Sequence, residues 1–72
     1  MIPTLATSTF CGPCKMLKSR LDAGGFSYAV ADMMEDRIFF QDNAVRSVPT
    51  LVTESGNISG VDAILAYFQE NP

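Results

Sequence analysis

The sequence predicts a small α/β domain in which helices cover the faces of a mixed four-stranded β-sheet. Segments with helical periodicity alternate with short β-favouring segments along the chain. The chain has 72 residues, of which 47% are hydrophobic, enough for one compact core. No linker or internal repeat divides it, so we expect residues 1–72 to form a single domain.

The first part of the chain is predicted to form a β-α-β unit. A short strand is expected over residues 4–7, followed by a helix from Cys11 to about Ala23. The pair Gly24-Gly25 then suits a C-terminal cap with a left-handed residue. The alternation of large and small residues over 26–31 predicts a second strand. Because a helix joins the two strands, we expect them to pair in parallel.

The middle of the chain is predicted to hold a short helix and a hairpin. A turn over residues 32–36 precedes a weakly amphipathic helix from Arg37 to about Ala44. Residues 50–53 should form a third strand. A tight turn over 54–57 should lead into a brief fourth strand near Ile58, antiparallel to the third.

The last helix has the clearest pattern of the chain. Val61, Ile64, Leu65 and Phe68 follow the i, i+3, i+4, i+7 spacing of an amphipathic helix, which should run to about Gln69. The element order is therefore β-α-β-α-β-β-α, with three helices flanking the sheet.

Charge and composition narrow the range of functions. The net charge is −3 and there is no His, which argues against nucleic-acid binding, an anionic membrane surface, imidazole catalysis and most zinc sites. No apolar run is long enough for a transmembrane helix. The N-terminus has no basic region of the kind that opens a signal peptide, so we expect a cytoplasmic protein.

The chain has two cysteines, in the motif Cys11-Gly12-Pro13-Cys14 at the predicted junction of strand and helix. Residues three apart on a helical turn have Cα atoms within the roughly 4.4–6.8 Å that a disulfide accepts. Gly12 should allow a tight turn, and Pro13 suits the first helical turn. A bridge across four residues stabilises a fold little, so a chemical role is favoured. A structural disulfide, inert thiols or a metal cluster shared between chains are the alternatives.

The two sulfur atoms are expected to behave differently. Cys11 lies at or beside the helix N-cap, where free N–H groups and the helix dipole should lower its thiol pKa by about one unit. The amide of Cys14 is the expected donor to that sulfur. Cys14 itself shares a helical face with Leu17 and Leu21 and should be shielded in the core. These positions predict Cys11 as the nucleophile and Cys14 as the resolving thiol.

Three segments in the same order resemble the thioredoxin/glutaredoxin superfamily, and the likeness covers nearly the whole chain. Residues 10–15 resemble the thioredoxin active site, with Phe10 in place of Trp. Residues 45–51 are similar to the thioredoxin segment that carries a cis-proline opposite the cysteines. Residues 58–62 and the last helix resemble glutaredoxins and their short relatives that depend on thioredoxin reductase. The resemblance implies a thioredoxin-like fold of glutaredoxin size.

The resemblance also assigns roles to four residues outside the cysteine motif. It implies that Pro49 is cis and that Val48, beside Cys11, pairs through its backbone with an extended substrate segment. It places Gly60 and Asp62 in the substrate site, although Asp62 could equally complement the dipole of the last helix. Phe10 could contact partner proteins or pack in the core.

Three positions depart from the family pattern. Leu5 stands where thioredoxins carry a buried Asp, and Ala6 and Ser8 stand where glutaredoxins carry Tyr and Lys. The absence of the Tyr and Lys weakens the case for glutathione binding.

The combined interpretation is a monomeric enzyme that reduces protein disulfides, with ribonucleotide reductase as one candidate target on the resemblance alone. It would bind no metal or cofactor, use the Cys11–Cys14 disulfide as its redox group, and be recharged by an enzyme like thioredoxin reductase. The alternatives are a glutathione-dependent glutaredoxin and a non-catalytic module that holds a partner or a shared metal cluster.

Overall fold

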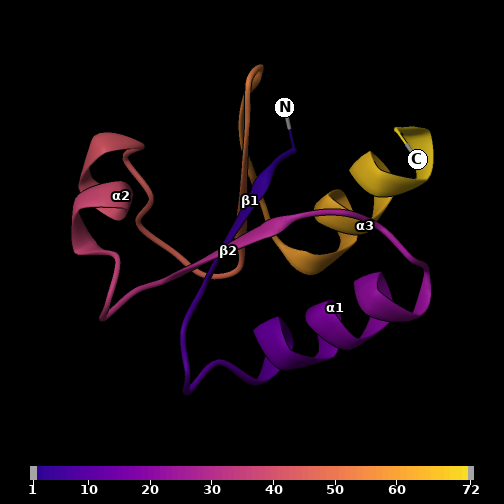
Figure 1. Cartoon of the computed structure of the whole chain (residues 1–72), viewed down its shortest axis with the longest axis horizontal. Helices are drawn as coiled ribbons and strands as arrows, with labels where there is room; N and C mark the ends of the chain where they lie inside the picture. Colours follow the sequence, from indigo (N-terminus) through magenta and orange to yellow (C-terminus); the bar gives the residue numbers. More distant parts are fainter. Residues whose placement is uncertain (1, 72) are drawn as a thin grey trace.

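The computed structural model describes residues 2–71, which form one four-stranded sheet and three helices (Figure 1). The elements in chain order are β1 (Thr4–Thr7), α1 (Gly12–Ala23), β2 (Ala29–Asp32), α2 (Arg37–Asp42), β3 (Thr50–Thr53), β4 (Gly56–Ser59) and α3 (Val61–Glu70). The predicted element order and α/β class are confirmed. None of the described helices is long and apolar enough to cross a membrane.

The sheet is mixed, with strand order β2-β1-β3-β4. β1 runs parallel to β2 and antiparallel to β3, and β3 runs antiparallel to β4. β1 is therefore a central strand, and Leu5 and Ala6 on its two faces are fully buried. Pro3 lies just outside the strand, where its carbonyl accepts a 2.9 Å hydrogen bond from the Ala29 amide and its missing N–H interrupts no ladder.

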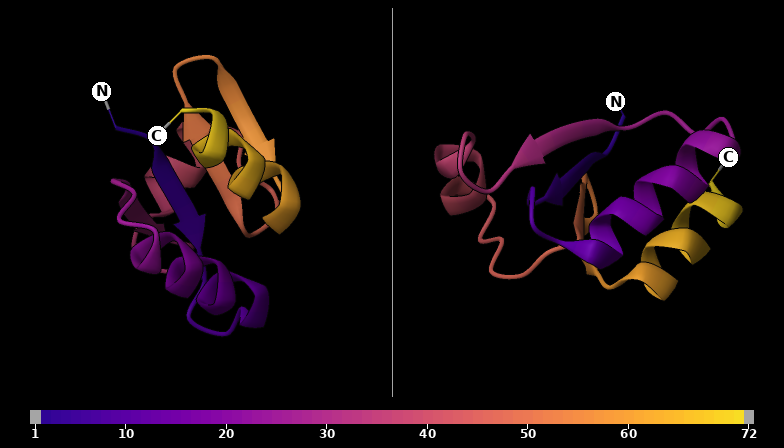
Figure 2. Two further views of the ribbon diagram at one scale, coloured as in Figure 1. Left: turned by 90° about the vertical axis from the view of Figure 1, so that its right-hand side faces the viewer. Right: turned by 90° about the horizontal axis from the view of Figure 1, so that it is seen from below.

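Helices cover both faces of the sheet, but unequally. α1 and α3 lie side by side on one face, and α2 lies alone on the other (Figure 2). Because successive side chains of a strand point to opposite faces of the sheet, Leu5 faces α1 and α3, whereas Ala6 faces α2. The larger core consists of Leu5, Leu17, Leu21, Leu51, Ile64 and Phe68. The smaller core consists of Ala6, Ala31, Phe40 and Val45.

The end of α1 explains why the second strand is shorter than predicted. The Phe26 amide donates to the Leu21 carbonyl at 3.1 Å and the Gly25 amide to the Asp22 carbonyl at 3.1 Å, with Gly25 at φ 72°. This is the Schellman arrangement, in which the second residue beyond the helix is held by the helix end. The strand predicted over residues 26–31 therefore begins only at Ala29.

Three other predicted boundaries also change. Asp32 lies opposite Thr7 and extends β2 into the segment predicted as a turn. α2 ends at Asp42 instead of about Ala44, because Ala44 has the left-handed φ of 53°. Gly56 pairs with Thr53, so residues 56 and 57 belong to β4 and only residues 54 and 55 form the turn.

Candidate active site

The cysteine motif lies where β1 passes into α1. β1 ends at Thr7, and the Cys11 amide donates back to the Ser8 carbonyl at 3.2 Å, which folds the connection into a tight turn. Cys11 is the N-cap of α1, with extended backbone angles, and its carbonyl accepts the Lys15 amide at 3.2 Å. Pro13 lies in the first helical turn, where no intrahelical donor is lost. The predicted placement of the motif at a helix N-terminus is confirmed.

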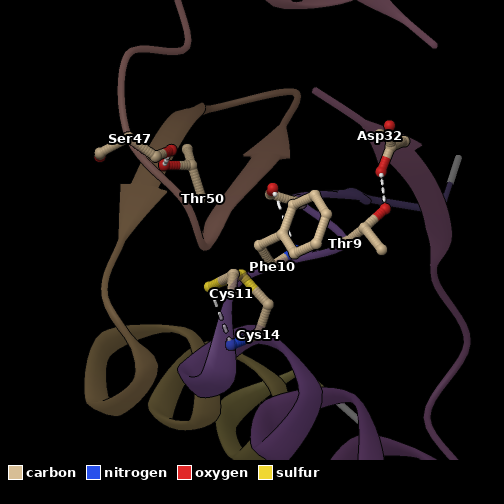
Figure 3. Close-up of a disulfide and its surroundings, with 8 residues drawn as sticks. Thr9, Phe10, Cys11, Cys14, Asp32, Ser47 and Thr50 are labelled. Atoms are coloured by element: carbon tan, nitrogen blue, oxygen red, sulfur yellow. Dashed lines mark hydrogen bonds between the residues drawn. A yellow bond between two sulfur atoms is a disulfide. The ribbon is translucent and has the colours of Figure 1, made fainter. Parts of the chain in front are cut away.

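Cys11 and Cys14 form a disulfide (Figure 3). Their Cα atoms are 5.2 Å apart, inside the range of about 4.4–6.8 Å that this bond accepts. The helical turn alone fixes this separation, so the bond can form and break without a rearrangement of the fold.

The two sulfur atoms have different surroundings. Cys11 is half-buried, whereas Cys14 is fully buried, on the same face of α1 as Leu17 and Leu21. The Cys14 amide donates to Cys11 Sγ at 3.1 Å, as expected from the sequence (Figure 3). A thiolate at Cys11 would accept this bond and meet the positive end of the α1 dipole, and both interactions favour the charged form.

The residues beside the sulfurs leave the site open to a partner. Phe10 is 93% exposed, which excludes its alternative role in the core. An added Cβ on Gly12 would meet no atom within 4 Å, and the φ of Gly12 is not positive, so this turn is open to residues other than glycine. Gly12 instead keeps the approach to Cys11 free of side-chain atoms.

The segment around Pro49 lies at the same edge of the sheet. Because Ala6 pairs with Thr50 in antiparallel register, the residues before Thr50 run alongside Thr7 and Ser8, which lead to Cys11. The Val48–Pro49 peptide bond is cis. Val48 is half-buried and Pro49 is buried. Figure 3 draws the loop with Ser47 and Thr50 in the surroundings of the disulfide, where Thr50 Oγ1 donates to the Ser47 carbonyl at 2.7 Å.

The start of α3 completes this edge. The Gly60 amide donates to the Pro49 carbonyl at 3.2 Å, which ties the two loops together. Gly60 is the N-cap of α3 with φ 94°, a backbone conformation that favours glycine. Asp62 is exposed in the first turn of α3, a position compatible with substrate contact and with dipole complementation. The fold thus brings all the residues singled out in the sequence to one edge of the sheet.

The structure reveals a link that the sequence reading missed. Thr9 Oγ1 donates to Asp32 Oδ1 at 3.3 Å (Figure 3). Asp32 Oδ2 also accepts the amides of Met34 and Glu35. This network joins the loop before Cys11 to the end of β2. The sequence carries a signal for this link. Thr9 follows β1 and Asp32 ends β2, and the ends of two parallel strands meet at the same edge of the sheet.

The surroundings of the cysteines lack a buried acid. Leu5 is fully buried in the larger core, and the buried polar side chains among residues 2–71 are those of Thr7 and Thr50. No cluster of three or more potential metal-ligating side chains occurs in the described part of the chain.

Comparison with known proteins supports the fold. No protein-family model matches the sequence, and no curated protein matches it significantly. Among solved structures, the thioredoxin-like protein BC3987 is similar with a TM-score of 0.72 and 22% identity, over 94% of this chain and 96% of that chain. Two glutaredoxins are also similar, over 96% of this chain.

The first of these is buckwheat glutaredoxin in complex with glutathione, with a TM-score of 0.68, 20% identity and 69% of that chain covered. The second is the holo form of glutaredoxin C1 from Populus tremula x tremuloides, with a TM-score of 0.66, 25% identity and 75% of that chain covered. The chain therefore has the thioredoxin-like fold that the sequence resemblance implies. This fold and the disulfide-forming cysteine pair together support a redox function.

Proposed function

We propose that this thioredoxin-like chain is a protein-disulfide reductase that works through Cys11 and Cys14. The observation that carries the proposal is the asymmetry of the pair. Cys11 lies half-exposed at the N-terminus of α1 with an amide donor on its sulfur, and Cys14 lies one turn later, fully buried. A structural bridge of this span would stabilise the fold little, and it would need no such difference between its two sulfur atoms.

The reaction proceeds by two thiol–disulfide exchanges. The Cys11 thiolate attacks one sulfur of the target disulfide, which forms a mixed disulfide and releases the other target sulfur as a thiolate that takes up a proton. Cys14 then loses its proton and attacks Cys11 Sγ. This step forms the Cys11–Cys14 disulfide and releases the second target thiol. Two electrons pass from the pair to the target, and a dithiol donor restores the reduced pair by the reverse sequence.

The loop before β3 would hold the substrate next to Cys11. The backbone of Val48 would pair with an extended segment of the target, as in strand addition. The bond from the Gly60 amide to the Pro49 carbonyl holds this loop against the start of α3. The exposed ring of Phe10 would form the opposite side of the entrance.

An enzyme like thioredoxin reductase is the proposed electron donor. Ala6 and Ser8 stand where glutaredoxins carry Tyr and Lys before the cysteine pair, and Ala6 is fully buried in the smaller core. Ala6 therefore presents no group to a small thiol such as glutathione.

Reduction of insulin disulfides with dithiothreitol as donor tests the proposal. The protein is expected to accelerate the reaction, and Cys11→Ser is expected to abolish the acceleration. Ser19→Ala, on the exposed side of α1, is the matched control and should leave the rate unchanged. No acceleration by the unaltered protein, or an unchanged rate for Cys11→Ser, would overturn the proposal.

The electron donor is tested by turnover with NADPH. Thioredoxin reductase with NADPH is expected to sustain insulin reduction. Glutathione with its reductase and NADPH should sustain it more slowly. The reverse order would identify the chain as a glutathione-dependent enzyme.

A further inference from the structure

α2 lies apart from α1 and α3 (Figure 1), on the other face of the sheet. Residues of α2 and of the loop before β3 line a groove on this face. Its volume is about 240 Å³. α2 contributes Arg37, Phe40 and Gln41, the loop contributes residues 45–48, and Met33 completes the lining. Phe40 and Val45 are buried and form an apolar floor, whereas the two arginines, Arg37 and Arg46, are exposed.

The groove adjoins the candidate active site through Val48. This residue both lines the groove and precedes Pro49 in the loop that runs alongside the connection to Cys11. A segment that pairs with the Val48 backbone near Cys11 and continues past α2 would enter the groove. The groove is therefore placed to contact residues that flank a target cysteine.

The charge of the groove is opposite to that of the chain. Eight acids outnumber five bases overall, yet two of the five bases line this groove, and no carboxylate is among its described lining residues. The carboxylate of Asp36, at the start of α2, is directed at the backbone, because its Oδ2 accepts the Asp32 amide at 2.8 Å. Two guanidinium groups over an apolar floor suit a carboxylate on an aliphatic stem, which guanidinium binds through two parallel hydrogen bonds.

We propose that this groove binds an acidic side chain of the protein substrate, a Glu or Asp that flanks the target cysteine, and that Arg37 and Arg46 determine this specificity. The inference rests on the proposed function and names the kind of substrate that it selects. The half-exposed Met33 in the lining can adapt to different neighbouring side chains, which suits a site for varied polypeptide segments.

The test uses three disulfide-linked peptide dimers that differ only beside their cysteine, where they carry Glu, Gln or Lys. With dithiothreitol as donor, kcat/KM for the Glu peptide is expected to exceed that for the Gln peptide by about fivefold, the size of a partly exposed charge-assisted contact. The Lys peptide should be the slowest. Raising the salt to about 1 M, where charges are screened beyond about 3 Å, should bring the three rates together.

Arginine variants test whether the preference for the Glu peptide arises in the groove. Arg37→Gln with Arg46→Gln should reduce the ratio of the Glu to the Gln peptide to about one, and Arg46→Lys should retain part of it. Arg20→Gln removes the same charge from the exposed side of α1 and should leave the ratio unchanged. Circular dichroism and thermal unfolding confirm that each variant is folded.

The outcomes separate this inference from the proposed function. Equal rates for the three peptides, or an equal loss of preference in Arg20→Gln, would overturn the groove inference while leaving the reductase intact. A preference for Lys would also overturn it. If the double arginine variant loses turnover of a glutathione mixed disulfide but keeps the peptide preference, the groove binds glutathione and the inference fails. No reduction of any peptide would instead overturn the proposed function.

Discussion

The two faces of the sheet are built differently. On one face α1 and α3, of 12 and 10 residues, bury four leucines and Ile64 completely. On the other face the small side chains of Ala6 and Ala31 are covered by Phe40 of α2, which has six residues, and by Val45 of the following loop; Phe40 and Val45 are 9% and 8% exposed. Ile38 on α2 remains 72% exposed. The first face is a deep core, and the second is a shallow layer with a groove.

The difference matches the demands of the proposed chemistry. Cys14 belongs to the helix on the deep face, where dense packing holds α1 in place against the sheet. The proposed substrate groove lies on the shallow face, where few buried contacts restrain α2. In the proposed function, the reacting atoms would lie on the densely packed face and the substrate groove on the shallow face.

The largest effect is expected from truncating the deep core. Leu51→Ala should lower the free energy of unfolding by about 3 kcal/mol, because the fully enclosed side chain leaves a cavity. Val45→Ala on the shallow face should cost about 1.5 kcal/mol, since fewer atoms are lost at a site that can relax. Urea unfolding of the oxidised protein measures both values.

Leu51→Val provides a milder change if Leu51→Ala does not fold. Equal losses for the two alanine variants, or a larger loss for Val45→Ala, would show that the two faces are equally well packed.

A smaller effect is expected in the local opening of the helices. Backbone amides of α2 should exchange with solvent at least about tenfold faster than buried-face amides of α1, because a short helix over a shallow core can open without global unfolding. Hydrogen exchange followed by NMR measures both sets in one sample. Equal protection in α1 and α2 would mean that the shallow face opens only with the whole molecule.

The smallest effect concerns the hydrogen bond between Tyr28, which lies just before β2, and Asp22 on α1. Tyr28 donates its hydroxyl to Asp22 Oδ1 at 2.7 Å, and burial, then this hydrogen bond and the charge of Asp22, raise its pKa from 10.0 to about 12. A pKa raised in the folded state gives stability that is present below the unfolded value and is lost as the pH rises through the folded one. Stability should therefore fall between about pH 10 and about pH 12.

Tyr28→Phe should remove this part of the alkaline decline. The decline is measured as the urea midpoint against pH, with Tyr67→Phe as the comparison. A decline of the same size in Tyr28→Phe would show that other groups cause it.

Local patterns predicted most of the deep face. The bounds of β1 and β3 and the buried stripe of α1 agree with the sequence, because hydrophobic periodicity and the break at Gly24-Gly25 are local signals. The predicted bounds of β2 and β4 were wrong where a backbone N–H or C=O group forms its hydrogen bond with a different element than expected. The Phe26 amide serves the end of α1, so a β-favouring segment could not start a strand there. Residues 56 and 57 pair with β3 although Gly and Asn are typical of turns.

The candidate site was predictable to a similar degree. The cysteine motif and its helical context placed the sulfurs correctly, including the amide donor from Cys14. The contact between Gly60 and Pro49 depends on the register of β3 against β4, and the pairing of Thr9 with Asp32 depends on where β2 ends. The groove depends on how α2 is positioned against the loop before β3, and no local sequence pattern predicts this position.

The central claim is that Cys11 attacks and Cys14 resolves, and trapping of the mixed disulfide tests it most directly. Each single variant is reduced, mixed with insulin and analysed by mass spectrometry after quenching with acid. Cys14→Ser is expected to accumulate a covalent complex joined through Cys11, because the buried thiol that would release it is gone. Cys11→Ser is expected to form none. A complex of Cys11→Ser joined through Cys14, or the absence of any complex with Cys14→Ser, would contradict the account.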